Sequence, residues 1–566
     1  MDIETATQEK ENLGLLCFPA ENEKGEFSSF LKEKENKKFS SFLKEKEILG
    51  FCMQNGLLID KEALNLFSET TDIDSAKMII EKIKEHTNMR IITKNIFIQH
   101  RDTIDKFFSK IPDNQKESIQ NLKIKLGLSI EISSSTLFER EKILDEGAVK
   151  IITTHASPGK KFNVSDFTNY FRNRFSELKG FLQERPELTN LVSINKISGG
   201  KQGISIIGMI LDKKVTKNKN IIMEIEDSTG RIKVLINQNK KEAYEKAENL
   251  CLDAVAGFKG SGNKDIFFAN EVYLPDAALP EKKHSLLDEN AVFISDIHVG
   301  SKLFLEKSFL KFIDYLNCKI PNTSEAEKIK YLFIVGDVVA GVGVYPNQEK
   351  DLEIKDIEGQ YSHAAELFAK IRSDIKIIMI PGNHDCVRLA EPQPILDEKY
   401  TWPLYALKNI TFASNPSIIN IGATKDFSGF DVLMYHGFSY FYYANNIPKL
   451  SMTDAINSPD RIMHYLLQNR HLAPTHASVQ YSPFDKDPLL IRKVPDIFVS
   501  GHLHKGAASY YNNILTLSST CWENLTSFQE KVGANPDFCK VPLFNLKTRA
   551  VKILDFHESD EGRNEQ

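Results

Sequence analysis

The stretch Ser500-Gly-His-Leu-His-Lys-Gly506 follows the apolar run Ile497-Phe498-Val499, so two histidines stand one residue apart where a predicted strand ends. In an extended backbone, residues i and i+2 project to the same side, so His502 and His504 point the same way. Such a pair is either a solvated loop or two ligands that meet at one site. The rest of the chain decides between these two interpretations.

Four more predicted strands end in polar groups of the same kind. They span residues 291–295, 331–335, 375–380 and 432–435, and the groups after them are Asp296 and His298, Asp337, Asn383 and His384, and His436. In layered α/β folds, functional groups gather outside the carboxyl ends of the strands, so we expect these side chains to converge. Five such strand ends in one region favour a single site over five unrelated turns.

The residue types of this site predict a two-metal centre. Carboxylate, imidazole and amide groups suit divalent metals, and we expect two ions, Mn first, with Fe, Zn or Mg as alternatives. A single carboxylate such as Asp337 can bridge two ions about 3.5–4 Å apart. Such a pair of ions polarises a phosphoryl group and holds a hydroxide for in-line attack.

Length and composition limit the class of protein. The 566 residues are too many for one hydrophobic core and predict roughly three or four domains. The net charge is -5 and the pI is near 6.3, so the overall charge does not indicate a nucleic-acid partner. The seven scattered cysteines form no CxxC pair, which favours a reducing compartment without a disulfide framework or zinc ribbon. No apolar run approaches the roughly 18 residues of a membrane span, and the N-terminus lacks a signal-peptide profile, so we expect an intracellular, cytoplasmic protein without a membrane partner.

The pattern along the chain predicts a multidomain α+β protein. An N-terminal helical region comes first, then an OB-fold β-barrel, then an α/β sandwich. The barrel rests on five predicted strands, with a helix over 240–250 before the fourth, although another small barrel stays open. The expected barrel faces carry few aromatic residues, so protein docking is at least as well supported as DNA binding. The predicted segments are a low-complexity tail over 1–47, a small helical domain over 48–110, a linker with helices over 111–190, the OB-fold over 191–275 and the sandwich over 286–557.

The five strand-end motifs together resemble the calcineurin-like metallophosphoesterase superfamily, whose pattern is D-x-H, G-D, G-N-H-[DE], H and G-H-x-H. The resemblance implies that His384 is the acid or transition-state stabiliser at the leaving oxygen. It also implies two metal sites that share Asp337: one with Asp296, His298 and His504, and the other with Asn383, His436 and His502.

Further segments are similar to the small subunit of the archaeal family D DNA polymerase. They include Gly336–Gln348 (GDVVAGVGVYPNQ), Arg388–Pro394 and Ser518–Trp522, whereas the phosphatase hallmark GDxVDRG is missing. This resemblance covers about residues 150 to 557 and implies a proofreading 3′–5′ exonuclease that acts on DNA 3′ ends beside a large catalytic subunit. Arg388 is then a candidate substrate contact. The segment departs from the family pattern at Ala340 and Asn347, where we expect Asp and Gly, but no expected ligand is lost.

Two other functions compete with the exonuclease. One is a catalytically weak scaffold subunit of the polymerase, which the complete set of ligand types disfavours. The other is a stand-alone repair nuclease or phosphatase, which the preceding barrel disfavours. Copurification of a large polymerase chain separates the stand-alone enzyme from the two subunits, and metal content with an exonuclease assay separates the scaffold from the enzyme.

A short segment near residue 104 is similar to the sliding-clamp binding motif Q-x-x-[ILM]-x-x-[FY]-[FY]. Ile104, Phe107 and Phe108 have the required spacing, and Arg101 stands where Gln belongs. Helical spacing of apolar residues more often marks core packing, and that alternative is the stronger one here.

Overall fold

The structure is a computed structural model, and the chain forms two compact units, residues 1–144 and 145–566. The clamp-like residues Ile104, Phe107 and Phe108 lie outside the described residues, and so does nearly all of the predicted tail. None of the helices in the described part of the chain has the length and apolar character that a membrane crossing requires. The described residues are 44, 46–60, 63, 64, 67, 68, 73–86, 91, 92, 149–155, 161–199, 201–321, 323–531 and 533–557.

The first unit packs a helix near two short strands that the sequence did not predict. Helix α3 (Ile73–His86) lies within the segment predicted as a small helical domain and buries Ala76 and Ile80. Strands β1 (Leu58–Ile59) and β2 (Ile91–Ile92) pair in parallel. Two residues per strand are too few for a propensity signal, so only the pairing reveals them.

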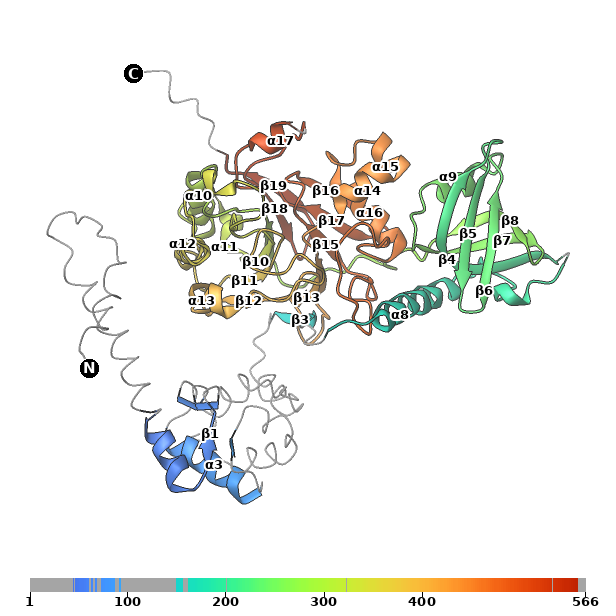
Figure 1. Ribbon diagram of the computed structural model, residues 1–566. Coiled ribbons are helices and arrows are strands. Elements are labelled where there is room, and N and C mark those ends of the chain that lie inside the picture. The colour runs from blue at the N-terminus through green and yellow to red at the C-terminus, as the bar shows by residue number, and fades with distance from the viewer. Residues whose placement is uncertain are drawn as a thin grey trace. The chain divides into compact units, whose positions relative to one another are not determined.

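Two six-stranded sheets form the centre of the second unit (Figure 1). The first has the order β12-β11-β10-β9-β18-β19, and its strands β9 to β12 are parallel. The second has the order β16-β17-β15-β14-β13-β3, with β14, β15 and β17 parallel. The first sheet contains β9 (Asn290–Ile294), β10 (Ile329–Val335), β11 (Lys376–Ile380), β12 (Ile410–Phe412), β18 (Lys540–Asn545) and β19 (Val551–Asp555). The second contains β3 (Lys150–Thr153), β13 (Ser417–Ile421), β14 (Phe430–Met434), β15 (Ile497–Ser500), β16 (Ala507–Tyr511) and β17 (Ile514–Ser518).

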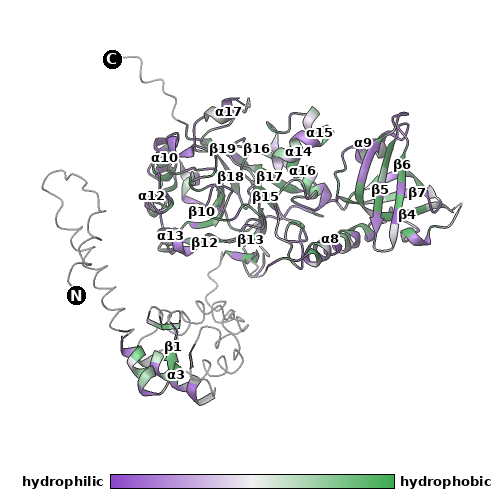
Figure 2. Cartoon of the chain, in the orientation of Figure 1, coloured by the Kyte–Doolittle hydropathy of each residue, from purple (hydrophilic) through white to green (hydrophobic). Residues whose placement is uncertain are grey.

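The two sheets pack face to face through one apolar layer. Phe293 of β9 and Phe333 of β10 stack at 5.0 Å and belong to the same buried cluster as Val432 of β14 and Val499 of β15. Strands buried on both faces are almost wholly apolar, which is why these runs have no alternating pattern. Hydrophobic residues gather on these central strands, whereas the outer helices carry many hydrophilic residues (Figure 2).

Helices cover the outer faces of both sheets, as expected for a layered α/β domain. Helices α10, α12 and α13 share a buried cluster with the first sheet, and α14, α15 and α16 share one with the second. The helices are α10 (Glu306–Leu316), α11 (Ser324–Glu327), α12 (Ile357–Ala369), α13 (Glu398–Tyr405), α14 (Tyr440–Asn446), α15 (Pro448–Met452), α16 (Pro459–Asn469) and α17 (Ser527–Lys531). The second unit also contains two 3₁₀ turns, Ile194–Lys196 and Gln348–Lys350.

A closed five-stranded barrel precedes the sheets, with the strand order β4-β5-β6-β8-β7. Its five strands and the helix before the fourth follow the predicted order along the chain. The elements are β4 (Lys201–Val215), β5 (Ile221–Asp227), β6 (Gly230–Ile236), α9 (Lys241–Glu248), β7 (Val255–Gly262) and β8 (Ile266–Tyr273). Strand β4 pairs with β7 along its first part and with β5 along its second, with register shifts near Ile204 and Asp212.

Helix α8 (Val164–Gln183) is fixed by a buried charge network. The Arg174 guanidinium donates to Asp487 at 2.7 Å, and neither side chain is more than 1% exposed. The same carboxylate accepts from the Tyr170 hydroxyl at 2.7 Å and lies 2.8 Å from His471 Nε2. Burial raises the pKa of Asp487, but Arg174 and His471 outweigh it and hold that pKa far below its usual range. The carboxylate therefore stays ionised and anchors the helix.

Replacing Asp487 with Asn should strongly destabilise the protein, because it leaves the Arg174 charge buried without its partner. Breaking one side of a buried pair costs roughly 3–5 kcal/mol. Urea denaturation should show this loss. The control is Arg492→Gln, which breaks the partly exposed pair with Glu177 and should cost about 1 kcal/mol or less. Equal effects from the two variants would contradict the anchoring role.

Candidate metal centre

Eight polar residues lie where five strands end, and all eight were predicted from the sequence. Strands β9, β10 and β11 are parallel neighbours in one sheet, and β14 and β15 are parallel neighbours in the other. Their carboxyl ends therefore open on one edge of the sandwich. The residues are Asp296 and His298 after β9, Asp337 after β10, Asn383 and His384 after β11, His436 after β14, and His502 and His504 after β15.

The backbone at this edge is unusual. Five of these residues have a positive φ between 49° and 70°, in the left-handed region that non-glycine residues seldom adopt. Close approach also requires glycine nearby: a Cβ on Gly382 would collide with the Asp337 carboxylate, and one on Gly336 would collide with the His436 ring. The five residues are Asp296, His298, Asp337, His502 and His504.

The side chains converge in three overlapping groups whose candidate ligand atoms lie within 4.8 Å of one another. Two of the three groups share the Asp337 carboxylate. His436 Nε2 lies 3.3 Å from Asp337 Oδ2 and 3.0 Å from Asn383 Oδ1. The groups are Asp296, His298 and His504; His298, Asp337 and His384; and Asp337, His436 and His502.

The arrangement fits divalent cations on its own geometry. Asp296 Oδ1 is buried and accepts no hydrogen bond, although His504 Nε2 lies 3.3 Å away. His504 Nε2 also faces His298 Nε2 at 3.3 Å. A cation among these three atoms would be coordinated by the carboxylate oxygen and both imidazole nitrogens. Oxygen with imidazole nitrogen is a donor set that suits Mn, Fe or Zn.

Burial and mutual pairing set the charges of the cluster. Burial raises the pKa of Asp337, but His436 and His384 outweigh it and hold that pKa well below its usual range. Burial lowers the pKa of His436, yet the Asp337 carboxylate raises it to about 9. For His298 burial prevails and lowers the pKa to about 4, so this ring is neutral at neutral pH. A neutral imidazole has a free lone pair with which to bind a metal.

Backbone carbonyls and an amide orient the histidine rings. His436 Nδ1 lies 2.9 Å from the Val335 carbonyl, and His384 Nδ1 lies 2.8 Å from the Ala340 carbonyl. A carbonyl can only accept, so each Nδ1 carries a proton and each Nε2 is turned toward the cluster. The Gln529 amide lies 2.8 Å from His504 Nδ1 and orients a third ring. Gln529 is not among the residues predicted from the sequence, because no local pattern pairs it with His504.

The two departures from the family pattern, Ala340 and Asn347, have structural explanations. Asn347 has φ 64°, the left-handed conformation that glycine would otherwise supply and that asparagine tolerates. Ala340 is buried, and its carbonyl rather than its side chain contacts His384. The substitutions therefore leave the backbone beside Asp337 intact.

Arg388, the predicted substrate contact, donates hydrogen bonds to carbonyl groups of its own loop. Its Nε donates to the Ala390 carbonyl at 3.1 Å and its Nη2 donates to the Pro392 carbonyl at 2.6 Å. The side chain is half-buried. Its role toward a substrate stays a prediction.

Glu391 is a buried acid near the metal centre. It is 1% exposed, and its Oε2 accepts from the Tyr435 hydroxyl at 3.1 Å. Tyr435 directly precedes His436 in the chain. Its Oε1 has no hydrogen-bond partner. Burial raises the pKa of Glu391 to about 8, against the smaller opposing effects of Tyr435 and His436. The carboxyl is therefore largely protonated at neutral pH.

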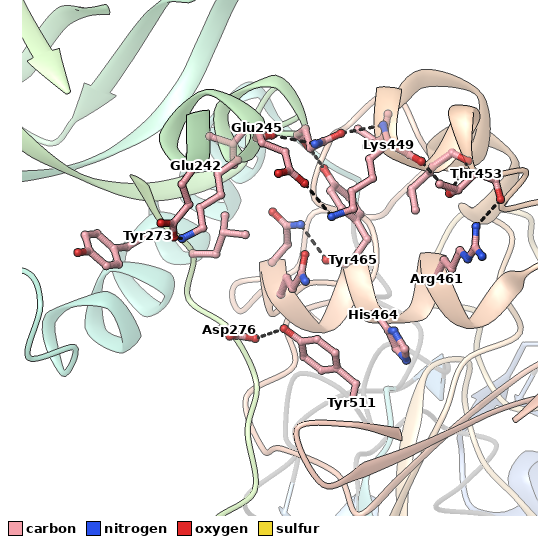
Figure 3. Close-up of a pocket in the computed structure, with 18 of the residues that line it drawn as sticks. Glu242, Glu245, Tyr273, Asp276, Lys449, Thr453, Arg461, His464, Tyr465 and Tyr511 are labelled. Atoms are coloured by element: carbon pink, nitrogen blue, oxygen red, sulfur yellow. Dashed lines mark hydrogen bonds and ion pairs between the residues drawn. The ribbon is translucent and has the colours of Figure 1, made fainter. Parts of the chain in front are cut away.

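A separate hollow of about 580 Å³ lies between α9 of the barrel and helices α15 and α16 (Figure 3). Pairs of charged and polar groups span it: Glu245 meets Lys449 at 2.9 Å, and Asp276 accepts from the Tyr511 hydroxyl at 2.7 Å. None of the predicted metal ligands lines this hollow. Its groups join the barrel to the sandwich.

The fold and the convergent site define a calcineurin-like phosphoesterase domain, and the family model of that description matches residues 290–506. Such a domain implies divalent metal ions. Beyond this domain, the chain is similar to proteins named DNA polymerase II small subunit. The one from Methanothermobacter thermautotrophicus is 35% identical over 514 residues, which are 90% of this chain and 99% of that protein.

The chain therefore belongs to the family of archaeal DNA polymerase II small subunits. The Pyrococcus abyssi member is 40% identical over 69% of this chain and 63% of its own length, so this chain spans less than two thirds of that relative. The Halobacterium salinarum member is 35% identical over 69% of this chain and 75% of its own length. The long shared region includes the barrel as well as the phosphoesterase domain.

Replacing Glu391 with Gln should make stability less dependent on pH. A folded-state pKa of about 8, above the ordinary 4.5, means that the folded protein binds this proton more tightly. The resulting contribution to stability is fully present below the ordinary pKa and is lost as the pH rises through about 8. Denaturant unfolding between about pH 5 and about pH 9 should show the variant gaining on the wild type as the pH rises. A constant difference would contradict a protonated Glu391.

Proposed function

We propose that the protein is the 3′–5′ exonuclease subunit of a heteromeric replicative DNA polymerase and hydrolyses DNA phosphodiesters with a two-metal centre. The observation that carries this proposal is the position of Asp337, which is grouped with His298 on one side and with His436 and His502 on the other. One carboxylate between two sets of ligands is the arrangement that a bridged pair of cations requires. The family membership and the phosphoesterase domain support DNA as the substrate.

The proposed ligands divide into two sets that share Asp337. Asp296, His298 and His504 would complete one set, and Asn383, His436 and His502 would complete the other. We propose Mn as the first choice, with Fe, Zn or Mg as alternatives. When bound, two such cations would supply Lewis-acid polarisation of the phosphate and a hydroxide nucleophile.

His384 is the proposed proton donor at the leaving 3′-oxygen. Its Nδ1 is tied to the Ala340 carbonyl and its backbone N–H donates to Asp337 Oδ1 at 2.8 Å, so the ring is held firmly beside the cluster. The ring is only half-buried, which lets a substrate reach it. Its free Nε2 is the atom that would carry the proton.

The proposed partners are a large catalytic polymerase subunit, DNA 3′ ends and a sliding clamp. We interpret the closed barrel as an OB-fold because its helix lies between the third and fourth strands. The barrel and the phosphoesterase domain together are the proposed docking region for the large subunit. Clamp binding through Ile104, Phe107 and Phe108 stays a prediction from the sequence.

The direct test is an exonuclease assay on a DNA strand labelled at its 3′ end, with added Mn²⁺, using the chain alone and with its large subunit. Stepwise shortening from the 3′ end is expected. A chain that binds metal and the large subunit but leaves the strand intact would be a scaffold, and the proposal would fail.

Replacing Asp337 with Ala should abolish hydrolysis and lower the metal content while the fold persists. Two cations at close range require the shared negative charge, and alanine removes it. Activity, metal content and circular dichroism measure the three parts of this expectation. The control is Asp374→Ala, which removes a half-exposed carboxylate paired with Lys330 and should leave activity unchanged. Wild-type rates from Asp337→Ala would refute the site.

Replacing His384 with Ala should keep both metals and lower the rate by about 10²–10⁴-fold, the usual contribution of a positioned acid. Metal content and single-turnover rates on the same preparation separate binding from chemistry. The control is His363→Ala, which changes a histidine on α12 that contacts Glu306. If His384→Ala loses metal, the residue is a ligand and not the acid.

A further inference from the structure

An exposed aromatic ring borders the candidate metal centre on the side of His502. Phe441 is the second residue of α14, and its ring centre lies 5.5 Å from that of His502 in an edge-to-face contact. Phe438 contacts the same imidazole at 5.5 Å but packs against the core. Phe441 lies outside this core, and 43% of it is exposed. A large apolar side chain is therefore partly exposed to solvent directly beside a proposed ligand.

The border on the side of His384 is formed by the Gly341–Asn347 loop, which is also apolar. Three of its side chains are exposed large hydrophobic groups: Val342, Val344 and Tyr345, at 49%, 36% and 42%. The loop lies directly against the site, because a Cβ on Gly341 would collide with the His384 carbonyl. An apolar group of this size on a polar edge marks a contact surface.

Two buried glutamines hold this loop in one shape. Gln360 accepts from Gly341 N at 2.8 Å and donates back to its carbonyl at 3.1 Å. Gln348 donates to the Ala340 carbonyl at 2.9 Å and accepts from Val344 N at 2.8 Å. The Tyr345 hydroxyl donates to Asp351 at 3.0 Å, which restrains the ring. The exposed side chains are thus presented by a rigid backbone, and a preorganised surface binds with less entropic cost.

We propose that Phe441 and the Gly341–Asn347 loop are the surfaces that hold unpaired bases on the two borders of the metal centre, with Phe441 and Tyr345 stacking on the bases that flank the scissile phosphate. This inference rests on the proposed exonuclease function. A base is attached to its phosphate through one sugar, so a phosphate held among the ligands brings the neighbouring bases to these borders. Aromatic side chains bind bases of any sequence by stacking.

The preference for unpaired ends follows from the same stacking. In a duplex, both faces of an internal base are already covered and its edge is paired. Only a base that has left the duplex can place a face on Phe441 or Tyr345, and the cost of leaving is smallest for a mismatched or single-stranded end. The two borders would therefore select for the substrates of proofreading.

The test compares Phe441→Ala and Tyr345→Ala with the wild-type full chain in Mn²⁺. The substrates are single-stranded DNA with all bases present, and the same strand made abasic at either nucleotide that flanks the scissile phosphate. On the complete strand, each variant should lose about 5- to 150-fold in kcat/KM, the value of one base stack. On one of the abasic strands, the loss should disappear, because the base that the side chain held is absent. The control is Trp402→Ala, an exposed aromatic on α13, which should match the wild type on every strand.

Three results would overturn the inference. A loss of the same size on complete and abasic strands would mean that the side chains act by positioning His502 or His384. No loss on any strand would mean that the borders are not used. Loss of the large subunit from the variants, with unchanged hydrolysis, would mean that the borders bind protein. A wild-type chain that cuts no 3′ end would instead refute the proposed function itself, so the two failures are distinguishable.

Discussion

Two carboxylates, Asp296 and Asp337, are buried at the edge where the two sheets open, and the local structure is organised around their charge. Taking an anion out of water costs several kcal/mol unless a positive charge compensates it. Among the described residues, their ion-pair partners are His504 and His436. Neutral rings such as His298 cannot share that task. The protein therefore concentrates negative charge where cations would relieve it, and the clearest sign of this is Asp296 Oδ1, which is buried and accepts no hydrogen bond.

The need to bring these buried charges together also explains the unusual backbone conformation at this edge. Left-handed geometry at a non-glycine residue costs roughly 1–2 kcal/mol, and five cluster residues adopt it. The strain persists because the surroundings determine each conformation, as when Asp385 accepts from both Gly382 N and Val338 N. Strained residues that cluster in this way usually mark a functional site.

The strand ends could be predicted from the sequence because the signal there is local. A run such as Tyr331–Val335 followed by Gly336-Asp337 combines an apolar strand with a polar group that has no place in a core, and parallel strands bring such groups to one edge. Long-range pairings leave no such mark. Arg174 and Asp487 are 313 positions apart, and no local pattern joins them. Gln529 likewise stands in a short helical segment, and only the fold brings it to His504.

Strand β3 illustrates how a region predicted as linker contributes to the fold of the phosphoesterase region. Lys150–Thr153 pairs antiparallel with β13 and forms the last strand of the second sheet, far in sequence from the rest of that sheet. A shortened chain that began at the first sheet would lose this strand and leave the hydrogen-bonding groups of β13 open. An unpaired edge next to apolar residues such as Ile419 and Ile421 invites other chains to add to it. The boundary for producing the phosphoesterase region alone therefore lies before Lys150, and cuts made after it would favour aggregation over folding.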